Sequence, residues 1–245
     1  MKMNYSFAFV IILITSITSN CLAQADSTLF QRWSKTDGLI WVNKIDRDAA
    51  VDSIAIYVPL AVKYCKKMGV HFTKREDWIF PMKGYTKIGY RSKGKDYRDS
   101  RFDYFQGGES HGHPAHDIFI RDIDANALED STGKHVDALA MVSGVVFNII
   151  SDWKPGDFGR GGNSVKIFDP ESEAMFYYSH LDTVTVKVGQ IVKAGEKIGT
   201  VGRTGRNAIH GKTHLHIAYY PIDDGEPEPE DFIEDLYKAE KRAMK

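Results

Sequence analysis

Cysteine is scarce in this chain of 245 residues, which has only Cys21 and Cys65. Two thiols cannot build a disulfide scaffold or a four-thiolate zinc site. A metal site here would therefore need nitrogen and oxygen ligands. Nine histidines are available for that purpose, and all except His71 lie within residues 111–216.

An excess of charge of one sign is also lacking. Lysine and arginine number 32 against 33 aspartates and glutamates, which gives a formal net charge of -1. The chain therefore has no excess of positive charge that would attract a polyanion such as DNA, and no nucleic-acid partner is expected. The 42% hydrophobic and 27% charged content excludes a disordered, collagen-like or polytopic membrane protein, and it suffices for one large or two small domains.

The N-terminal segment has the three-part pattern of a secretory signal peptide. Lys2 precedes an apolar run over residues 7–14, and small residues follow around Ala23 and Ala25. The run is shorter than the roughly 20 residues that span a bilayer. We therefore expect residues 1–25 to be a signal peptide, with no stable membrane span after its cleavage.

Lipidation of Cys21 is an alternative fate for this segment. A cysteine just after the apolar run is where bacterial lipoproteins are processed, and an acyl chain would anchor the protein to a membrane. Residues 18–20 fit such a signal poorly, however. Cleavage after Ala25 would leave Cys65 as the single cysteine and would exclude an intrachain disulfide.

The residue pattern of the remaining chain divides it into three regions. Apolar residues at helical spacing predict an amphipathic helix over residues 47–68, which Gly69 ends. From Trp78 onward, short β-branched and aromatic runs broken by Gly and Asp predict antiparallel strands, including residues 144–150, and tight hairpins over residues 184–201. The expected divisions are an N-terminal helical region (26–77), a β domain (78–222), and an acidic linker with a C-terminal helix (223–245).

Histidines gather in two short motifs. In an extended strand His214 and His216 share one face, whereas Leu215 between them points toward the core. The earlier pair His113 and Asp117 is four residues apart, a spacing that also shares a strand face. Three ligands from His113, Asp117 and one of the second pair, together with a water, would form the open tetrahedral site of a catalytic zinc.

Further motifs accompany these histidines in a fixed order. They are Phe80-Pro81-Met82-Lys83-Gly84-Tyr85, His113-x-x-x-Asp117-Ile118, Gly162-Asn163-x-Val165, Tyr178-Ser179-His180-Leu181-Asp182, Val188-Gly189-Gln190-x-Val192-x-Ala194-Gly195-x-x-Ile198-Gly199, Gly202-x-Thr204-Gly205 and His214-Leu215-His216. In this order they resemble the M23 peptidases, the lysostaphin and LytM-like zinc endopeptidases of bacterial cell walls, across residues 78–222.

The resemblance implies a fold, a cofactor and roles for five residues. The fold would be mainly β, an antiparallel sheet with a groove, preceded by a short helical region and followed by a C-terminal helix. Residues 78–222 would be the peptidase domain. The resemblance implies that His113, Asp117 and His216 hold one zinc ion per chain, and that His180 and His214 act in catalysis. Which of these two is the general base stays open.

The chain departs from the family pattern near the first motif. Ala115 replaces a glycine and His116 replaces an aliphatic residue, and we expect His116 to pack or to support the ligands. The polar stretch 121–136 is longer than expected. Its opening hints at calcium, but Ala127 and Gly133 stand where an EF-hand needs Gly and Glu. We expect an exposed loop at the groove rim.

Substrate contacts are expected from the loops around the groove. Arg203 and Asn207, in the turn before the last histidines, are the predicted substrate-binding residues. Arg206, Trp153 and Arg160 are further candidates to line the groove and to select the substrate.

The predicted function is hydrolysis of peptide bonds in peptidoglycan stem peptides or cross-links by a zinc-activated water. The alternative is a non-catalytic module on the same scaffold that binds the cell wall or activates an amidase, although no ligand is missing here. A biotinyl or lipoyl carrier, suggested by the turns over residues 188–199, lacks its Met-Lys-Met tip. We expect an exported, chiefly periplasmic protein, with an outer-membrane lipoprotein or a secreted protein as alternatives.

Overall fold

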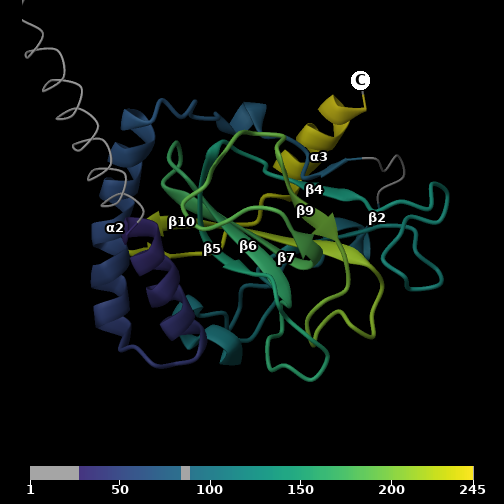
Figure 1. Ribbon diagram of the computed structural model, residues 1–245, viewed down its shortest axis with the longest axis horizontal. Helices are drawn as coiled ribbons and strands as arrows, with labels where there is room; N and C mark the ends of the chain where they lie inside the picture. The colour runs from purple at the N-terminus through teal and green to yellow at the C-terminus, as the bar shows by residue number, and fades with distance from the viewer. Residues whose placement is uncertain (1–27, 84–88, 245) are drawn as a thin grey trace, which may run out of the picture.

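The structure is a computed structural model that describes residues 28–83 and 89–244 (Figure 1). The predicted signal peptide and Cys21 lie outside the described residues. Within the described part of the chain, no helix combines the length and the apolar character needed to cross a membrane. In chain order the elements are a helix over residues 28–41, α2 (Arg47–Lys67), η1 (Arg75–Asp77), β1 (Met82–Lys83), β2 (Gly89–Tyr90), η2 (Arg91–Gly94), η3 (Tyr104–Glu109), β3 (His116–Phe119), β4 (Asp137–Leu139), β5 (Gly144–Ile150), β6 (Asn163–Asp169), β7 (Ala174–Val184), β8 (Ile191–Val192), β9 (Lys197–Val201), β10 (His214–Asp223), β11 (Glu226–Pro227) and α3 (Ile233–Ala243).

The strands form one antiparallel sheet, which confirms the predicted fold class. Its main path runs β1-β4-β9-β7-β10-β3-β2, while β6 pairs with β7, β5 with β6, β8 with β5 and β11 with β10. The long strands β7 and β10 lie side by side at its centre, with Pro221 opposite Ala174 and His216 opposite Ser179. The predicted strand 144–150 coincides with β5.

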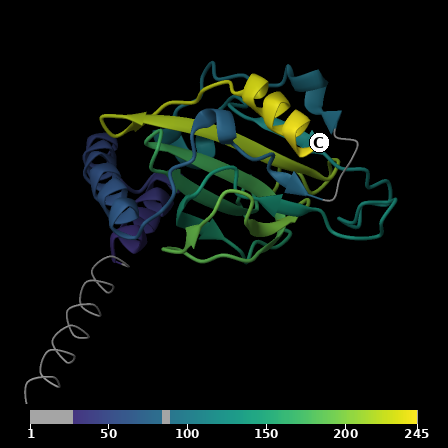
Figure 2. The same ribbon diagram turned by 90° about the horizontal axis from the view of Figure 1, so that it is seen from above.

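The N-terminal helices pack against one side of the sheet (Figures 1 and 2). α2 begins at Asp46, whose side chain accepts the backbone N–H groups of Asp48 and Ala49. The predicted helix over 47–68 is confirmed. The helix buries Ala50, Ile54, Val58, Ala61 and Cys65, whereas Val51 is only partly buried.

The helix over residues 28–41 joins this region to the sheet core. Phe30 and Trp33 are each 1% exposed. The Trp33 indole stacks on Phe147 of β5 with ring centroids 4.6 Å apart, and it contacts Phe168 of β6 at 5.3 Å. The N-terminal helical region therefore shares a hydrophobic core with the strands.

The C-terminal helix covers another part of the sheet. α3 buries Leu236 and Ala239 in a cluster with Trp78 and Phe232. Arg75 of η1 holds the first turn of α3 through an ion pair with Asp235 at 2.7 Å. The predicted helix is confirmed, although α3 begins at Ile233.

Candidate functional site

The two histidine motifs meet because β3 and β10 are neighbours. Asp117 lies directly opposite His216 in the antiparallel ladder. Leu215 is fully buried in the core, so the alternation of the strand turns His214 and His216 to the other face. The predicted sharing of a face by these two histidines agrees with the structure.

His113 reaches the same point by a different route from the one the spacing predicted. β3 begins at His116, so His113 precedes the strand. Its backbone instead pairs with Arg98 through hydrogen bonds of 2.7 and 2.8 Å. The side chain still meets Asp117, with 3.1 Å between Nε2 and Oδ1.

Three potential ligand atoms for a metal ion converge in the structure. Nε2 of His113 lies 3.1 Å and Nδ1 of His216 lies 2.9 Å from Oδ1 of Asp117. The ligand atoms of the three residues lie within 4.8 Å of one another. Ligand bonds of about 2.0–2.1 Å in a tetrahedral zinc site place neighbouring ligand atoms about 3.3 Å apart. The donor set therefore fits zinc in type and in spacing.

Backbone carbonyls fix which ring nitrogen of three histidines faces the site. Nδ1 of His113 donates to the carbonyl of Asp96 at 2.9 Å, Nδ1 of His180 to that of Thr204 at 2.8 Å, and Nδ1 of His214 to that of Lys212 at 2.6 Å. A carbonyl can only accept, so each neutral ring carries its proton at Nδ1 and presents a lone pair at Nε2.

These lone pairs explain why a cation suits the centre. Nε2 of His113 faces Oδ1 of Asp117 at 3.1 Å, and Nε2 of His214 lies 3.7 Å from the same oxygen. Neutral imidazole lone pairs and a carboxylate are all acceptors and repel one another. A bound cation, or additional protons, would relieve that repulsion.

Burial and the close approach of these side chains also shift the pKa values of the cluster. Burial would raise the pKa of Asp117, but hydrogen bonds from the His113 and His216 rings, when their nitrogens facing the carboxylate carry protons, hold this pKa well below its usual range. Burial would lower the pKa of His113, yet Asp117 raises it. Burial, followed by the nearby His214 and His216, lowers the pKa of His180 well below its ordinary value. The free protein therefore keeps His180 neutral near pH 7.

His180 sits on a strained backbone. It has a positive φ of 62°, uncommon for a residue other than glycine. Its N–H donates to the carbonyl of Gly161 at 2.8 Å. Its ring centroid lies 4.7 Å from that of His214 and 5.5 Å from that of His216. The structure thus brings together all five residues that the sequence motifs indicate.

A buried carboxylate supports two of the candidate ligands. Asp96, 3% exposed, accepts the N–H of Asp117 at Oδ2 (2.9 Å) and faces Nδ1 of His116 with Oδ1 (3.0 Å). Its carbonyl orients His113. His116 is fully buried and contacts Asp231 through Nε2 at 3.0 Å. The expectation that His116 supports the ligands agrees with these contacts.

Sequence reasoning missed Asp96 and Arg91. Nη1 of Arg91 bonds Oδ2 of Asp117 at 3.0 Å, which leaves Oδ1 to the histidines. Both residues lie in a sequence segment of mixed charge, which has no periodicity or motif that would single them out.

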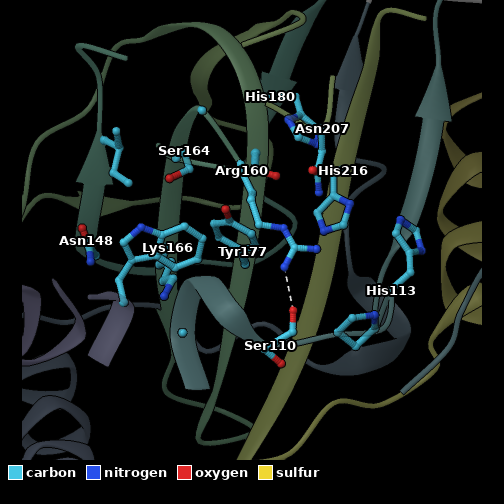
Figure 3. Close-up of a pocket in the computed structure, with 18 of the residues that line it drawn as sticks. Ser110, His113, Asn148, Arg160, Ser164, Lys166, Tyr177, His180, Asn207 and His216 are labelled. Atoms are coloured by element: carbon cyan, nitrogen blue, oxygen red, sulfur yellow. Dashed lines mark hydrogen bonds between the residues drawn. The ribbon is translucent and has the colours of Figure 1, made fainter. Parts of the chain in front are cut away.

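The cluster opens into a pocket of about 590 Å³ (Figure 3). Asn207, Trp153 and Arg160 line it, as expected of groove residues. Arg203 is not among the lining residues: its guanidinium donates to the carbonyls of Ala125, Ile209 and Gly211. Its predicted role in substrate binding stays a prediction, as does that of Asn207. Arg206 is exposed and lies over the Phe158 ring, outside the pocket.

The N-terminal helix supplies one wall of this pocket, which the sequence did not indicate. Asp37 and Trp41 line it together with Tyr104 and Lys166. The Asp37 carboxylate accepts from Lys166 Nζ at 2.6 Å, from the Tyr104 hydroxyl and from the Asn148 amide. These hydrogen bonds join Asp37, Lys166, Tyr104 and Asn148 into one polar network.

The long loop 121–136 folds on itself. Asp122 accepts the backbone N–H groups of Asn126 and Ala127 and the hydroxyl of Thr213. Its carboxylate lies near those of Asp124 and Asp130. The observed bonds are those of a turn that ties the loop to the start of β10.

Residues 125–227 match the family model described as peptidase family M23. Over these residues the chain is similar to the M23 peptidases. His180, His214 and His216 lie inside the matched residues, whereas His113 and Asp117 precede them. In the structure these two residues are supplied to the matched segment by the adjacent strand β3 and the turn before it.

Several solved structures are similar to this chain. A structure described as a glycyl-glycine endopeptidase LytM of Ruminococcus gnavus ATCC 29149 is 24% identical over 68% of this chain and 63% of that chain, with a TM-score of 0.49. The catalytic domain of lysostaphin from Staphylococcus simulans is 25% identical over 54% and 81% of the two chains, with a TM-score of 0.37. A zinc-containing peptidase of Vibrio cholerae is 24% identical over 65% and 39%, with a TM-score of 0.38.

This chain thus spans less than two thirds of the length of the first of these proteins. Because each TM-score is below 0.5, these similarities do not bear on the activity. The comparison with curated proteins gave no match.

Proposed function

We propose that the protein is a zinc-dependent endopeptidase that hydrolyses peptide bonds in peptidoglycan stem peptides or cross-links. The main support for this proposal is that the ligand atoms of His113, Asp117 and His216 lie within 4.8 Å of one another. The imidazole rings of His180 and His214 lie beside them. We also propose residues 78–222 as the peptidase domain, in an exported and chiefly periplasmic protein.

The proposed ligands are His113 through Nε2, Asp117 through Oδ1 and His216 through Nδ1, with one zinc ion per chain. Zinc bound there would supply a lowered pKa for a water and polarisation of the scissile carbonyl. Arg91 and Asp96 hold the Asp117 carboxylate and backbone in place. These contacts leave Oδ1 of Asp117 directed at the two imidazoles.

His180 and His214 are the proposed catalytic residues. Each donates its Nδ1 proton to a carbonyl, so each has a lone pair at Nε2 beside the ligand cluster. One Nε2 accepts a proton from the attacking water and returns it to the leaving amine. The other takes up a proton from solvent at Nε2 and then donates a hydrogen bond to the developing oxyanion.

The test is the cleavage of defined muropeptides, read by mass spectrometry, together with the zinc content of the purified protein. We expect one zinc ion per chain and chelator-sensitive cleavage. His216→Ala should lose zinc, whereas His214→Ala should keep zinc and lose cleavage. Full activity and equal zinc content in both variants would contradict the proposal. A zinc-free protein that cleaves nothing but stimulates another hydrolase would instead identify a non-catalytic module.

A further inference from the structure

Arg160 is a pocket charge that the proposed chemistry does not use. It lies in the loop between β5 and β6, and its side chain reaches into the pocket between the histidines and Lys166 (Figure 3). Nη1 donates to the carbonyls of Gly108 at 3.3 Å and Ser110 at 2.6 Å. Carbonyls orient a guanidinium but do not neutralise it.

The neighbouring cations of the pocket have anionic partners. Lys166 pairs with Asp37 at 2.6 Å, and Arg91 pairs with Asp117 at 3.0 Å. Lys212 is exposed to solvent. Among the described residues that line the pocket, Arg160 is therefore the one partly buried cation with no carboxylate in ion-pair contact.

The free edge of this guanidinium faces a ligand-sized space. Nε and Nη2 of Arg160 make no hydrogen bond to any described residue, because both hydrogen bonds of the side chain come from Nη1. A planar guanidinium matches a carboxylate with two parallel hydrogen bonds. Because Nη1 is already held, less side-chain entropy would be lost when such a ligand binds.

The loop that carries Arg160 is fixed to the catalytic residues. The carbonyl of Gly161 accepts the N–H of His180 at 2.8 Å, and the carbonyl of Arg160 accepts the N–H of Asn207 at 3.2 Å. A Cβ on Gly161 would lie 2.1 Å from the Tyr177 hydroxyl, so the loop packs tightly on β7. A group bound to Arg160 would thus be held at a set position relative to His180.

The side of the pocket near Arg160 is walled by the N-terminal helix. Gly107, next to the carbonyl that Arg160 contacts, has a φ of 49°, and a Cβ there would lie 2.4 Å from the carbonyl of Ile40. Helix 28–41 and η3 are therefore in close contact behind the guanidinium. The close contact restricts the movement of the η3 segment whose carbonyls hold the Arg160 guanidinium.

We propose that Arg160 binds a free carboxylate of the peptide substrate and selects peptides that carry this group near the scissile bond. This specificity role rests on the proposed endopeptidase function. Peptidoglycan stem peptides carry several free carboxylates, and the pocket offers one unpaired guanidinium to receive one of them.

The experiment compares a cross-linked stem-peptide dimer with a set of its derivatives in which each free carboxylate is converted, one at a time, to the carboxamide. For the wild type, one of these amides should lower kcat/KM by about 10-fold to 100-fold, the usual contribution of hydrogen bonds between charged groups. Arg160→Gln should cleave that amide as the wild type does but should lose the preference for the free acid. Arg160→Lys should retain part of the preference.

Arg206→Gln is the matched control, because it removes an exposed arginine that does not line the pocket. It should keep the wild-type preference. Equal rates of the wild type on the acid and on all the amides would overturn the proposal. An equal loss of kcat/KM on every substrate in Arg160→Gln would also overturn it, because that pattern indicates a structural role.

A binding measurement separates this proposal from the endopeptidase function. Calorimetric titration of the acid and amide peptides uses the zinc-loaded His214→Ala protein, or the wild type if that protein cleaves nothing. If the protein binds the acid peptide more tightly than the amide, and if Arg160→Gln abolishes this difference in affinity, the result would support the carboxylate site even without cleavage. Cleavage without such discrimination would reject the site and leave the endopeptidase proposal intact.

Discussion

Replacing Asp96 by alanine tests how the candidate ligands are held. The change removes the acceptor of the Asp117 N–H at 2.9 Å and the partner of His116 Nδ1 at 3.0 Å. Both donors are buried, and each unsatisfied buried donor costs about 1–3 kcal/mol. We expect Asp96→Ala to lower the free energy of unfolding by about 2–6 kcal/mol.

Metal affinity should fall as well, because Asp96 fixes the backbone of Asp117 directly. Loss of an outer contact to a ligand lowers metal affinity by about 10-fold to 100-fold. The assays are urea unfolding of the chelated protein and competition for zinc with a coloured chelator. Each is carried out on the purified full chain.

Asp231→Ala is the control for this experiment. It removes the other partner of His116, a carboxylate that is 47% exposed, and leaves the Asp117 N–H bonded. Its zinc affinity should stay at the wild-type value. If Asp96→Ala also binds zinc with wild-type affinity, or if both variants lose affinity equally, the reasoning about ligand positioning is refuted.

Three further predictions concern stability. Burial raises the pKa of Asp169 from 3.8 to about 6, so the protein loses stability as the pH rises from about 4 through 6. Asp169→Asn should therefore stabilise the protein at pH 7 by up to about 3 kcal/mol, and an equally large gain in the urea midpoint at pH 4 would contradict this. Trp33→Ala should lower the free energy of unfolding by about 3–5 kcal/mol, because it removes a buried indole from the sheet core. Ile56→Ala is the control and should leave the unfolding midpoint unchanged, because Ile56 is exposed. Equal midpoints for the two variants would show that helix 28–41 is not part of the core. Chelation should lower Tm in a way that added zinc reverses, because a ligand that binds only the folded state stabilises it; His216→Ala should show no such response.

The sequence was informative where a short period sets the geometry. The alternation of His214, Leu215 and His216 determined which side chains enter the site, because a strand has a period of two. The run 144–150 likewise predicted β5. The period was not the reason that His113 meets Asp117, since His113 precedes the strand and is placed by its pairing with Arg98.

Long-range packing was beyond the reach of local patterns. The region 26–77 was expected to be helical, but nothing in it indicated that Asp37 and Trp41 would line the pocket. Asp96 is one acidic residue in a segment of mixed charge, and its role depends on contacts with residues about 20 positions away. Such contacts exist only once the sheet has formed.

The wall formed by helix 28–41 has a practical consequence for any shortened version of this protein. A fragment limited to the matched residues 125–227 would omit His113 and Asp117. A fragment over 78–222 would keep all five histidine and aspartate positions but would leave Lys166 without Asp37. The smallest unit that preserves the pocket is therefore longer than either boundary implies, and it must begin before the helix that contains Asp37.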